Sequence, residues 1–201
     1  EETERQPARR DGRVRTLMLT VEEIDKSFCV DFVHAYHYSK VMPVHTKHYL
    51  GIYTDDALVG VLTLGWGTQP KATINKLFPG HDSSHYYEIG KMCMTPQYNE
   101  SRGKGNWGSR TVSAVVKWMK QNTDRKFLYT LADGIVGKVG FVYQESNFYY
   151  GGYFWTSVYM GEDGEKIHPR TTKWLCKENY RWLGDHELPT TDTQDKRGQV
   201  F

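Results

Sequence analysis

This chain of 201 residues has no long hydrophobic run and no strong excess of one charge. Its longest apolar stretches, such as ALVGVLTLGW, are much shorter than the roughly 20 residues that a transmembrane helix needs. We therefore expect no membrane partner. The formal net charge is only +2, so bulk charge does not identify a nucleic-acid binder. The sequence also contains no internal repeat and no low-complexity segment.

Cysteine is scarce as well. The only three cysteines are Cys29, Cys93 and Cys176, and they lack the paired spacing of zinc sites. An odd number without such spacing argues against a disulfide framework and indicates a reducing compartment. We therefore expect a cytoplasmic protein.

Aromatic residues, by contrast, are plentiful. They form 14% of the chain, with 14 tyrosines and 6 tryptophans. Such a composition suits the stacking of nucleic-acid bases, but an aromatic-rich core and surface would explain it equally well. The basic residues gather in two segments, one around Arg102, Lys104 and Arg110 and the other around Lys166, Arg170 and Lys173.

The organisation is that of one globular domain, since 38% of the residues are hydrophobic and 25% are charged. Residues 1–14 are polar and unpatterned, which predicts a flexible N-terminal arm. Residues 15–184 carry the periodic segments and form the expected catalytic domain. Residues 185–201 are expected to be a polar C-terminal tail, extended or disordered.

Helical spacing occurs in two long segments. The first begins at Thr20, which is expected to cap a helix with Ile24, Phe28 and Phe32 on its apolar face. It should end before Pro43. The second follows a glycine-rich loop and has a single apolar stripe, formed by Val112, Val115, Val116 and Met119.

Strand patterns separate these helices. HYLGIYTDDALVGVLTLGWG predicts a hairpin that turns at TDDA, and YYEIGKMCMTP predicts a strand closed by Pro96. KFLYTLAD reads as a buried strand, GKVGFVYQESNFYY as a short helix, and YFWTSVYMGEDGEKIHPRTTKWL as a last hairpin. The order predicts an α/β fold with a mixed sheet.

The segment SRGKGNWGSR lies directly before the second helix. Exposed amides at a helix N-terminus bind anions, and glycines allow a phosphate to approach the backbone. The residues expected to bind a cofactor here are Arg102, Gly103, Gly105, Gly108 and Ser109. A plain turn is the alternative. The segment is not a P-loop, because no Gly-Lys-Ser/Thr follows.

Two histidines close the first helix in HAYHYSK. His34 and His37 could share a face and bind a metal with a carboxylate or tyrosine from elsewhere, or they could simply complement the helix dipole.

Acidic and phenolic side chains supply further candidates. Asp133 ends an apolar strand, where side chains often enter an active site, although it could instead cap the next helix. Tyr143 could donate a proton to a leaving group, or pack with Phe148 and Tyr149. Glu88 could present an acid on one sheet face, or be a surface charge on an edge strand.

Together these motifs resemble a known family. YHYSK, EIGKM, LADGIVGKVGFVYQESNFYYGG and GEKIHPRT look like the corresponding segments of the phage Mom-type DNA-modification proteins, over roughly residues 30–170. That family is GNAT-like and alters adenine at its exocyclic amine, to N6-carbamoylmethyladenine, which shields phage DNA from restriction. The glycine loop likewise resembles the acyl-CoA pyrophosphate loop of GNAT acyltransferases, except that Trp107 stands where a small residue belongs.

The resemblance implies a GNAT-like single domain with a mostly antiparallel sheet flanked by helices. His37, Tyr38, Asp133 and Tyr143 match residues of the family's site, and its proposed iron dependence would make His37, Asp133 and Tyr143 metal ligands. The implied donor is acyl-CoA or another acyl donor, and the implied partner is double-stranded DNA with a flipped adenine. The protein would be phage-encoded and act in the host cytoplasm.

Other residues would hold the substrates. Asn147, with Gln144, would hydrogen-bond the base or the donor. The residues expected to contact DNA are Lys40, Arg110, His168 and Arg170.

Two other functions remain open. One is an ordinary acetyl-CoA-dependent N-acyltransferase of a small amine or protein, against which Trp107 counts. The other is a non-catalytic DNA-binding or anti-restriction protein on the same scaffold.

Overall fold

The computed structural model describes residues 18–55, 57–67, 78–99, 106–132 and 140–151, with the backbone of four later strands. The elements in chain order are β1 (Thr20–Glu23), α1 (Lys26–Tyr36), β2 (Thr46–Thr54), β3 (Ala57–Gly65), β4 (Tyr86–Met94), α3 (Pro96–Asn99), α4 (Trp107–Asn122), β5 (Phe127–Ala132), α5 (Phe141–Gln144), β6 (Tyr153–Trp155), β7 (Tyr159–Met160), β8 (Lys166–Ile167) and β9 (Lys196–Val200). None of the helices in the described part of the chain is long and apolar enough to cross a bilayer.

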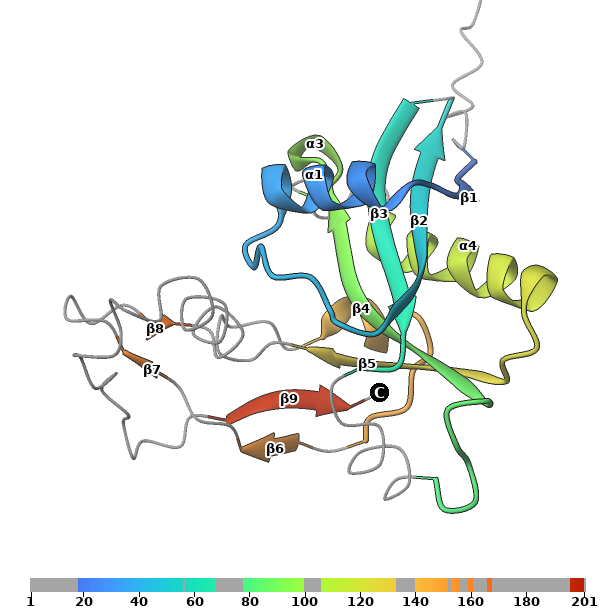
Figure 1. Cartoon of the computed structure of the whole chain (residues 1–201), viewed down its shortest axis with the longest axis vertical. Helices are drawn as coiled ribbons and strands as arrows, with labels where there is room; N and C mark the ends of the chain where they lie inside the picture. Colours follow the sequence, from blue (N-terminus) through green and yellow to red (C-terminus); the bar gives the residue numbers. More distant parts are fainter. Residues whose placement is uncertain are drawn as a thin grey trace, which may run out of the picture.

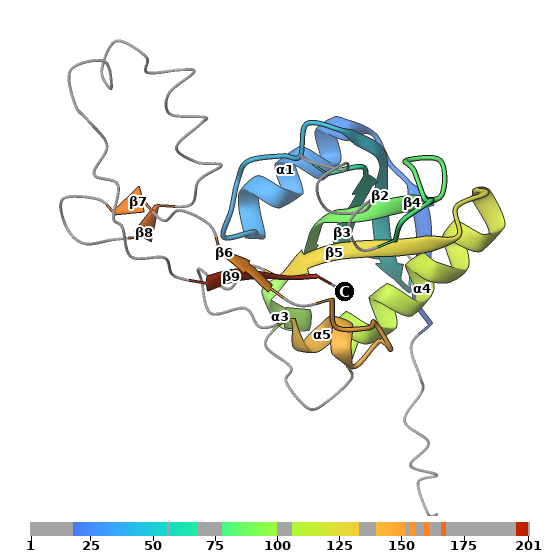
Figure 2. The ribbon, with the colours of Figure 1, turned by 90° about the horizontal axis from the view of Figure 1, so that it is seen from below.

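The main sheet has the order β1-β2-β3-β4-β5-β9-β6, and β7 pairs separately with β8 (Figure 1). All of these pairings are antiparallel except that of β4 with β5, which is parallel. Helix α1 covers one face, and α4 and α5 lie on the other (Figure 2). The predicted mixed α/β sheet flanked by helices is confirmed. The pairing of β9, which comes from the predicted tail, had no signal in the sequence.

The start of the first helix was predicted wrongly. Thr20–Glu23 form strand β1, which pairs with β2, and the helix begins only after Asp25. Pairing with β2 satisfies the backbone of this segment and overrides the local capping pattern. The apolar face also differs from the prediction, because Phe28 is 64% exposed while Cys29, Phe32 and Val33 are buried. As predicted, the helix ends before Pro43.

Strand β4 contains an irregularity that changes which side chains face which helix. Thr63 of β3 pairs with Lys91, whereas the next residue, Leu64, pairs with Ile89, so Gly90 is an extra residue. Such a β-bulge interrupts the alternation of a strand. Ile89 and Met94 consequently both belong to the core beneath α4, and Cys93 packs with α1.

Strands β4 and β5 pair only along their first halves. The ladder runs from Tyr86 with Phe127 to Ile89 with Thr130, and β4 then continues to Met94 paired with β3 only. Figure 1 shows the two strands running apart beyond this point. The Thr130 hydroxyl donates to the Ile89 carbonyl at 3.3 Å, at the last pair. The separation creates a place where side chains from β4, β5 and α5 can meet.

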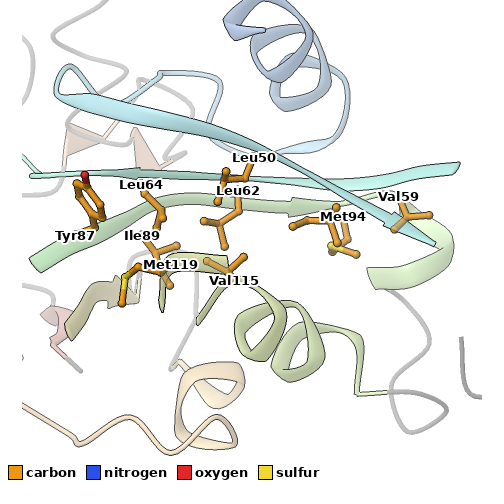
Figure 3. Close-up of a cluster of buried hydrophobic side chains, with 10 residues drawn as sticks. Leu50, Val59, Leu62, Leu64, Tyr87, Ile89, Met94, Val115 and Met119 are labelled. Atoms are coloured by element: carbon orange, nitrogen blue, oxygen red, sulfur yellow. The ribbon is translucent and has the colours of Figure 1, made fainter. Parts of the chain in front are cut away.

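The larger core lies between the sheet and α4 (Figure 3). Its buried members are Leu50, Ile52, Val59, Leu62, Leu64, Tyr87, Ile89, Met94, Val115 and Met119. A smaller core joins α1 to the opposite face through Cys29, Phe32, Val33, Val61 and Cys93. Burial raises the pKa of the free Cys29 and Cys93 thiols to about 11, so both are inert at neutral pH.

Leu62→Ala should lower the free energy of unfolding by about 2–5 kcal/mol, because this side chain is fully buried and its loss leaves a cavity. Met18→Ala is the control: Met18 is 75% exposed, and the change should stay within about 0.5 kcal/mol. Urea unfolding measures both. Equal losses in the two variants would contradict the placement of the core.

Candidate active site

A buried carboxylate lies where β4 and β5 part. Glu88 is only 6% exposed, and its side chain lies against Gly67, which follows β3. A Cβ on Gly67 would lie 1.8 Å from Glu88 Oε2, and the φ of +67° also favours glycine there. Glu88 is therefore neither exposed nor on an edge strand, which rules out the surface-charge alternative.

The charge of Glu88 contributes to the raised pKa of two tyrosines. Burial raises the pKa of Tyr143, a hydrogen bond with Thr130 lowers it, and the Glu88 charge raises it further; the net shift is upward. Burial and the Glu88 charge likewise raise the pKa of Tyr86 to about 12. Both phenols consequently stay protonated at neutral pH. The region thus contains a protonated phenol and a buried carboxylate whose charge acts on it, that is, a proton donor and a proton acceptor.

Tyr143 also packs, as the alternative interpretation predicted. It lies on α5 at the margin of the larger core, with its ring centroid 5.6 Å from that of Phe148. Tyr149, expected to pack with them, is instead 92% exposed.

The residues after α1 form a second part of the candidate site. The rings of His37 and Tyr38 stack with centroids 4.3 Å apart. The Ser39 amide lies 2.9 Å from His37 Nδ1, close enough to donate to it. Lys40 is exposed and donates to the His34 carbonyl, so the predicted DNA contact is available at the surface.

The start of α4 packs closely against α5. A Cβ on Gly108 would lie 2.1 Å from Val142 Cγ2, so this glycine allows α5 to approach α4. The Ser109 hydroxyl donates to the Asn106 carbonyl at 3.1 Å. Arg110 lies 4.5 Å above the Trp107 ring, a cation–π contact. Packing therefore accounts for Gly108 without a cofactor.

Several predicted residues cannot be placed. Asp133, His168 and Arg170 lie outside the described residues, as do the loop residues Arg102, Gly103 and Gly105. Asn147 lies shortly after α5, is exposed and has a φ of +62°. Its backbone N–H donates to the Gln144 carbonyl. Asn is among the few residues that tolerate this backbone conformation.

The described residues give no support to the predicted iron centre. No group of three or more His, Cys, Asp or Glu side chains within the described ranges could hold a metal ion. Asp133, one of the predicted ligands, lies outside the described residues.

A model of the Mom protein family matches residues 18–197. The chain belongs to the Mom protein family. A curated relative, the methylcarbamoylase mom of Escherichia phage Mu, is 27% identical over 154 residues, which are 76% of this chain. This Mom family member spans only 61% of the length of that relative.

Solved acetyltransferases are also similar in structure to this Mom family member. An AAC(6')-Ib in complex with paromomycin and acetyl-CoA has a TM-score of 0.45 and 8% identity, covering 75% of this chain and 90% of that one. A GNAT family acetyltransferase from Elizabethkingia anophelis with acetyl-CoA bound has a TM-score of 0.44 and 13% identity, covering 91% and 97% respectively.

Sequence reasoning missed one residue of this region. Lys91 is buried and donates to the Ser39 carbonyl at 2.9 Å. Simple alternation along EIGKM places Lys91 on the face opposite Glu88, and only the bulge at Gly90 reverses this. The isolated glycine within a strand pattern was the available signal.

Gly108→Ala should lower the free energy of unfolding by about 1–3 kcal/mol, because the new methyl group strikes Val142. Adding Val142→Ala should restore most of this loss. A double-mutant cycle by urea unfolding measures the coupling. If the double variant were no more stable than the sum of the single changes, contact with Val142 would not be the reason for this glycine.

Tyr86→Phe should reduce the sensitivity of stability to alkali. The folded-state pKa of Tyr86 is raised from 10 to about 12, so ionisation favours unfolding, and the stability present below pH 10 is lost as pH rises through 12. Phenylalanine cannot ionise, so the variant should lose less stability over this window. Tyr149→Phe, at a 92% exposed ring, is the control and should retain the wild-type pH dependence.

Proposed function

We propose that this Mom family member transfers a small carbon group to the exocyclic amine of adenine in double-stranded DNA, giving an N6-carbamoylmethyl-type product. The modification would protect phage DNA from restriction in the host cytoplasm. The family match over residues 18–197 supports this proposal most directly, and the phage Mu relative is itself named a methylcarbamoylase.

The described residues suit the proton transfers that such a reaction needs. When the adenine amine attacks, an N–C bond forms and the bond from that carbon to the donor's leaving group breaks. The amine loses a proton, which Glu88 would accept, and the leaving group gains one, which Tyr143 would donate. The raised pKa of Tyr143 keeps its proton in place until the leaving group develops negative charge.

The remaining parts of the site would bind the substrates. Asp133 would assist in proton transfer, while His37 and Tyr38 would line the same site from the turn after α1. Adenine must leave the base stack to be modified, which costs a few kcal/mol, and aromatic walls offset this cost. Gln144 and Asn147 are exposed near Tyr143 in sequence and would hydrogen-bond the base or the donor.

The donor would be acyl-CoA or another acyl donor if the product is N6-acyladenine. Carbamoylmethyl is an alkyl group, so that product would need a donor with its leaving group on a methylene carbon, and the mass of the nucleoside distinguishes the two. The donor's anionic groups would lie at the loop before α4, with Arg102, Gly103, Gly105 and Ser109 as candidate contacts. DNA phosphates would meet Lys40, Arg110, His168 and Arg170. Arg110 already lies over Trp107, so its guanidinium is held at the start of α4.

The decisive measurement is nucleoside mass spectrometry of DNA from cells that express this protein. Intact protein should produce a modified deoxyadenosine whose mass gives the group transferred. Asp133→Ala, Tyr143→Phe and Glu88→Gln should each reduce the product by roughly 100-fold or more, since each removes a positioned proton-transfer group. Glu145→Gln is the matched control, because this neighbouring carboxylate is exposed on the far end of α5.

The other outcomes identify the other functions. Unmodified DNA with a folded protein would overturn the proposal. Saturable acetyl-CoA binding with turnover on free amines would then indicate a small-amine acyltransferase. Salt-sensitive DNA binding without a new nucleoside would indicate a binding protein.

A further inference from the structure

Lys91 is an unusual residue to find in the interior. It is 4% exposed, although lysine normally keeps its ammonium group in water. A buried cation is costly unless it is paired or hydrogen-bonded. Its Nζ donates to the Ser39 carbonyl at 2.9 Å, a buried contact between positions 52 residues apart.

The bulge in β4 makes this contact possible. Because Gly90 is an extra residue, Lys91 and Cys93 lie on the face that α1 covers. Burial raises the pKa of Cys93, and the charges of Lys40 and Lys91 partly oppose this rise. Pro43 closes the turn over the bulge: a Cβ on Gly90 would lie 2.6 Å from Pro43 Cγ.

Ser39 connects Lys91 to His37 through its backbone alone. Its carbonyl accepts from Lys91, while its nitrogen and its oxygen each lie 2.9 Å from His37 Nδ1. Its own hydroxyl is buried and makes no hydrogen bond. The fold therefore requires the Ser39 peptide, rather than the Ser39 side chain, at this position.

The two contacts of Nδ1 correspond to two tautomers of neutral His37. Either the Ser39 amide donates to an unprotonated Nδ1, or a protonated Nδ1 donates to the Ser39 carbonyl. The Lys91 ammonium already donates to that carbonyl, so a second N–H donor there would lie beside its positive charge. A charge-assisted bond of this kind is stronger than a neutral one, so it disfavours a competing Nδ1–H donor.

We propose that Lys91 is a positioning residue that holds the His37–Ser39 turn against β4 and keeps the His37 proton on Nε2. This inference rests on the proposed function, in which His37 belongs to the site. With the proton on Nε2, the imidazole donates a hydrogen bond from that nitrogen. His37 then serves as a hydrogen-bond donor to substrate, oriented by its stacking on Tyr38.

The test uses the full chain labelled with ¹⁵N-histidine, in which long-range ¹H–¹⁵N spectra distinguish the two tautomers. Wild-type His37 should be protonated on Nε2 when neutral. Lys91→Met, which removes the cation but keeps the length of the side chain, should shift a measurable fraction of the proton to Nδ1. Ser39→Ala is the matched control, because it retains both backbone contacts, and its His37 spectrum should match wild type.

Activity provides a second readout. Lys91→Met should lower the kcat of DNA modification by roughly 10- to 100-fold, as for other residues that orient a site from behind, with little change in KM for DNA. A fall in thermal stability without a change in the His37 spectrum would show a merely structural role and overturn the proposal. A wild-type spectrum with the proton on Nδ1 would also overturn it.

Two measurements keep the test independent of activity and of the variant's folding. The tautomer is read without turnover, so a wild-type protein that modifies no DNA contradicts the proposed function and leaves the Lys91 inference to the spectrum. The scalar coupling across the hydrogen bond from Lys91 Nζ to the Ser39 carbonyl is measured in wild-type protein. A measurable coupling supports the contact on which the proposal rests even if Lys91→Met does not fold. The absence of this coupling contradicts the proposal.

Discussion

The pairing of β4 governs this structure. On one side β4 is hydrogen-bonded to β3 along most of its length, with one extra residue at Gly90; on the other it is paired with β5 for four residues only. The first irregularity turns Lys91 toward the segment after α1. The second ends the β4–β5 ladder one pair beyond Glu88, at Thr130, which hydrogen-bonds Tyr143 of α5. If β4 were a regular strand paired on both sides, neither part of the candidate site could form.

Burial and chemistry are linked through this strand. Backbone groups released from a ladder must find partners elsewhere, and Thr130 supplies one of them at the last β4–β5 pair. The same threonine hydrogen-bonds Tyr143, so the end of the ladder and the position of the phenol share one side chain. The Tyr143 phenol is thereby held by a residue of the sheet.

Sequence patterns were sufficient to predict the β2–β3 hairpin, strands β4 and β5, and helix α4, because the strands are apolar, β-rich runs bounded by turn residues and the helix has one apolar stripe. They were insufficient for Thr20–Glu23, whose strand conformation depends on pairing with β2, a partner distant in sequence. They also missed Lys91, because the sheet face on which this side chain lies depends on the bulge at Gly90. The resemblance proposed His37, Tyr38 and Tyr143 as site residues, but it could not reveal that Glu88 is buried or that Val142 packs against Gly108.

Helix α5 has four residues and is bounded by two left-handed positions, Gly140 and Asn147. So short a helix has little intrinsic stability, and its place comes from its neighbours. Because Gly108 has no side chain, Val142 of α5 packs directly on the start of α4, and the positions of the two helices are coupled. Any ligand or substitution that displaces the first turn of α4 will displace Val142, and with it the phenol one residue further along. Selection at the start of α4 would then act on catalysis without any change in the residues that touch the substrate.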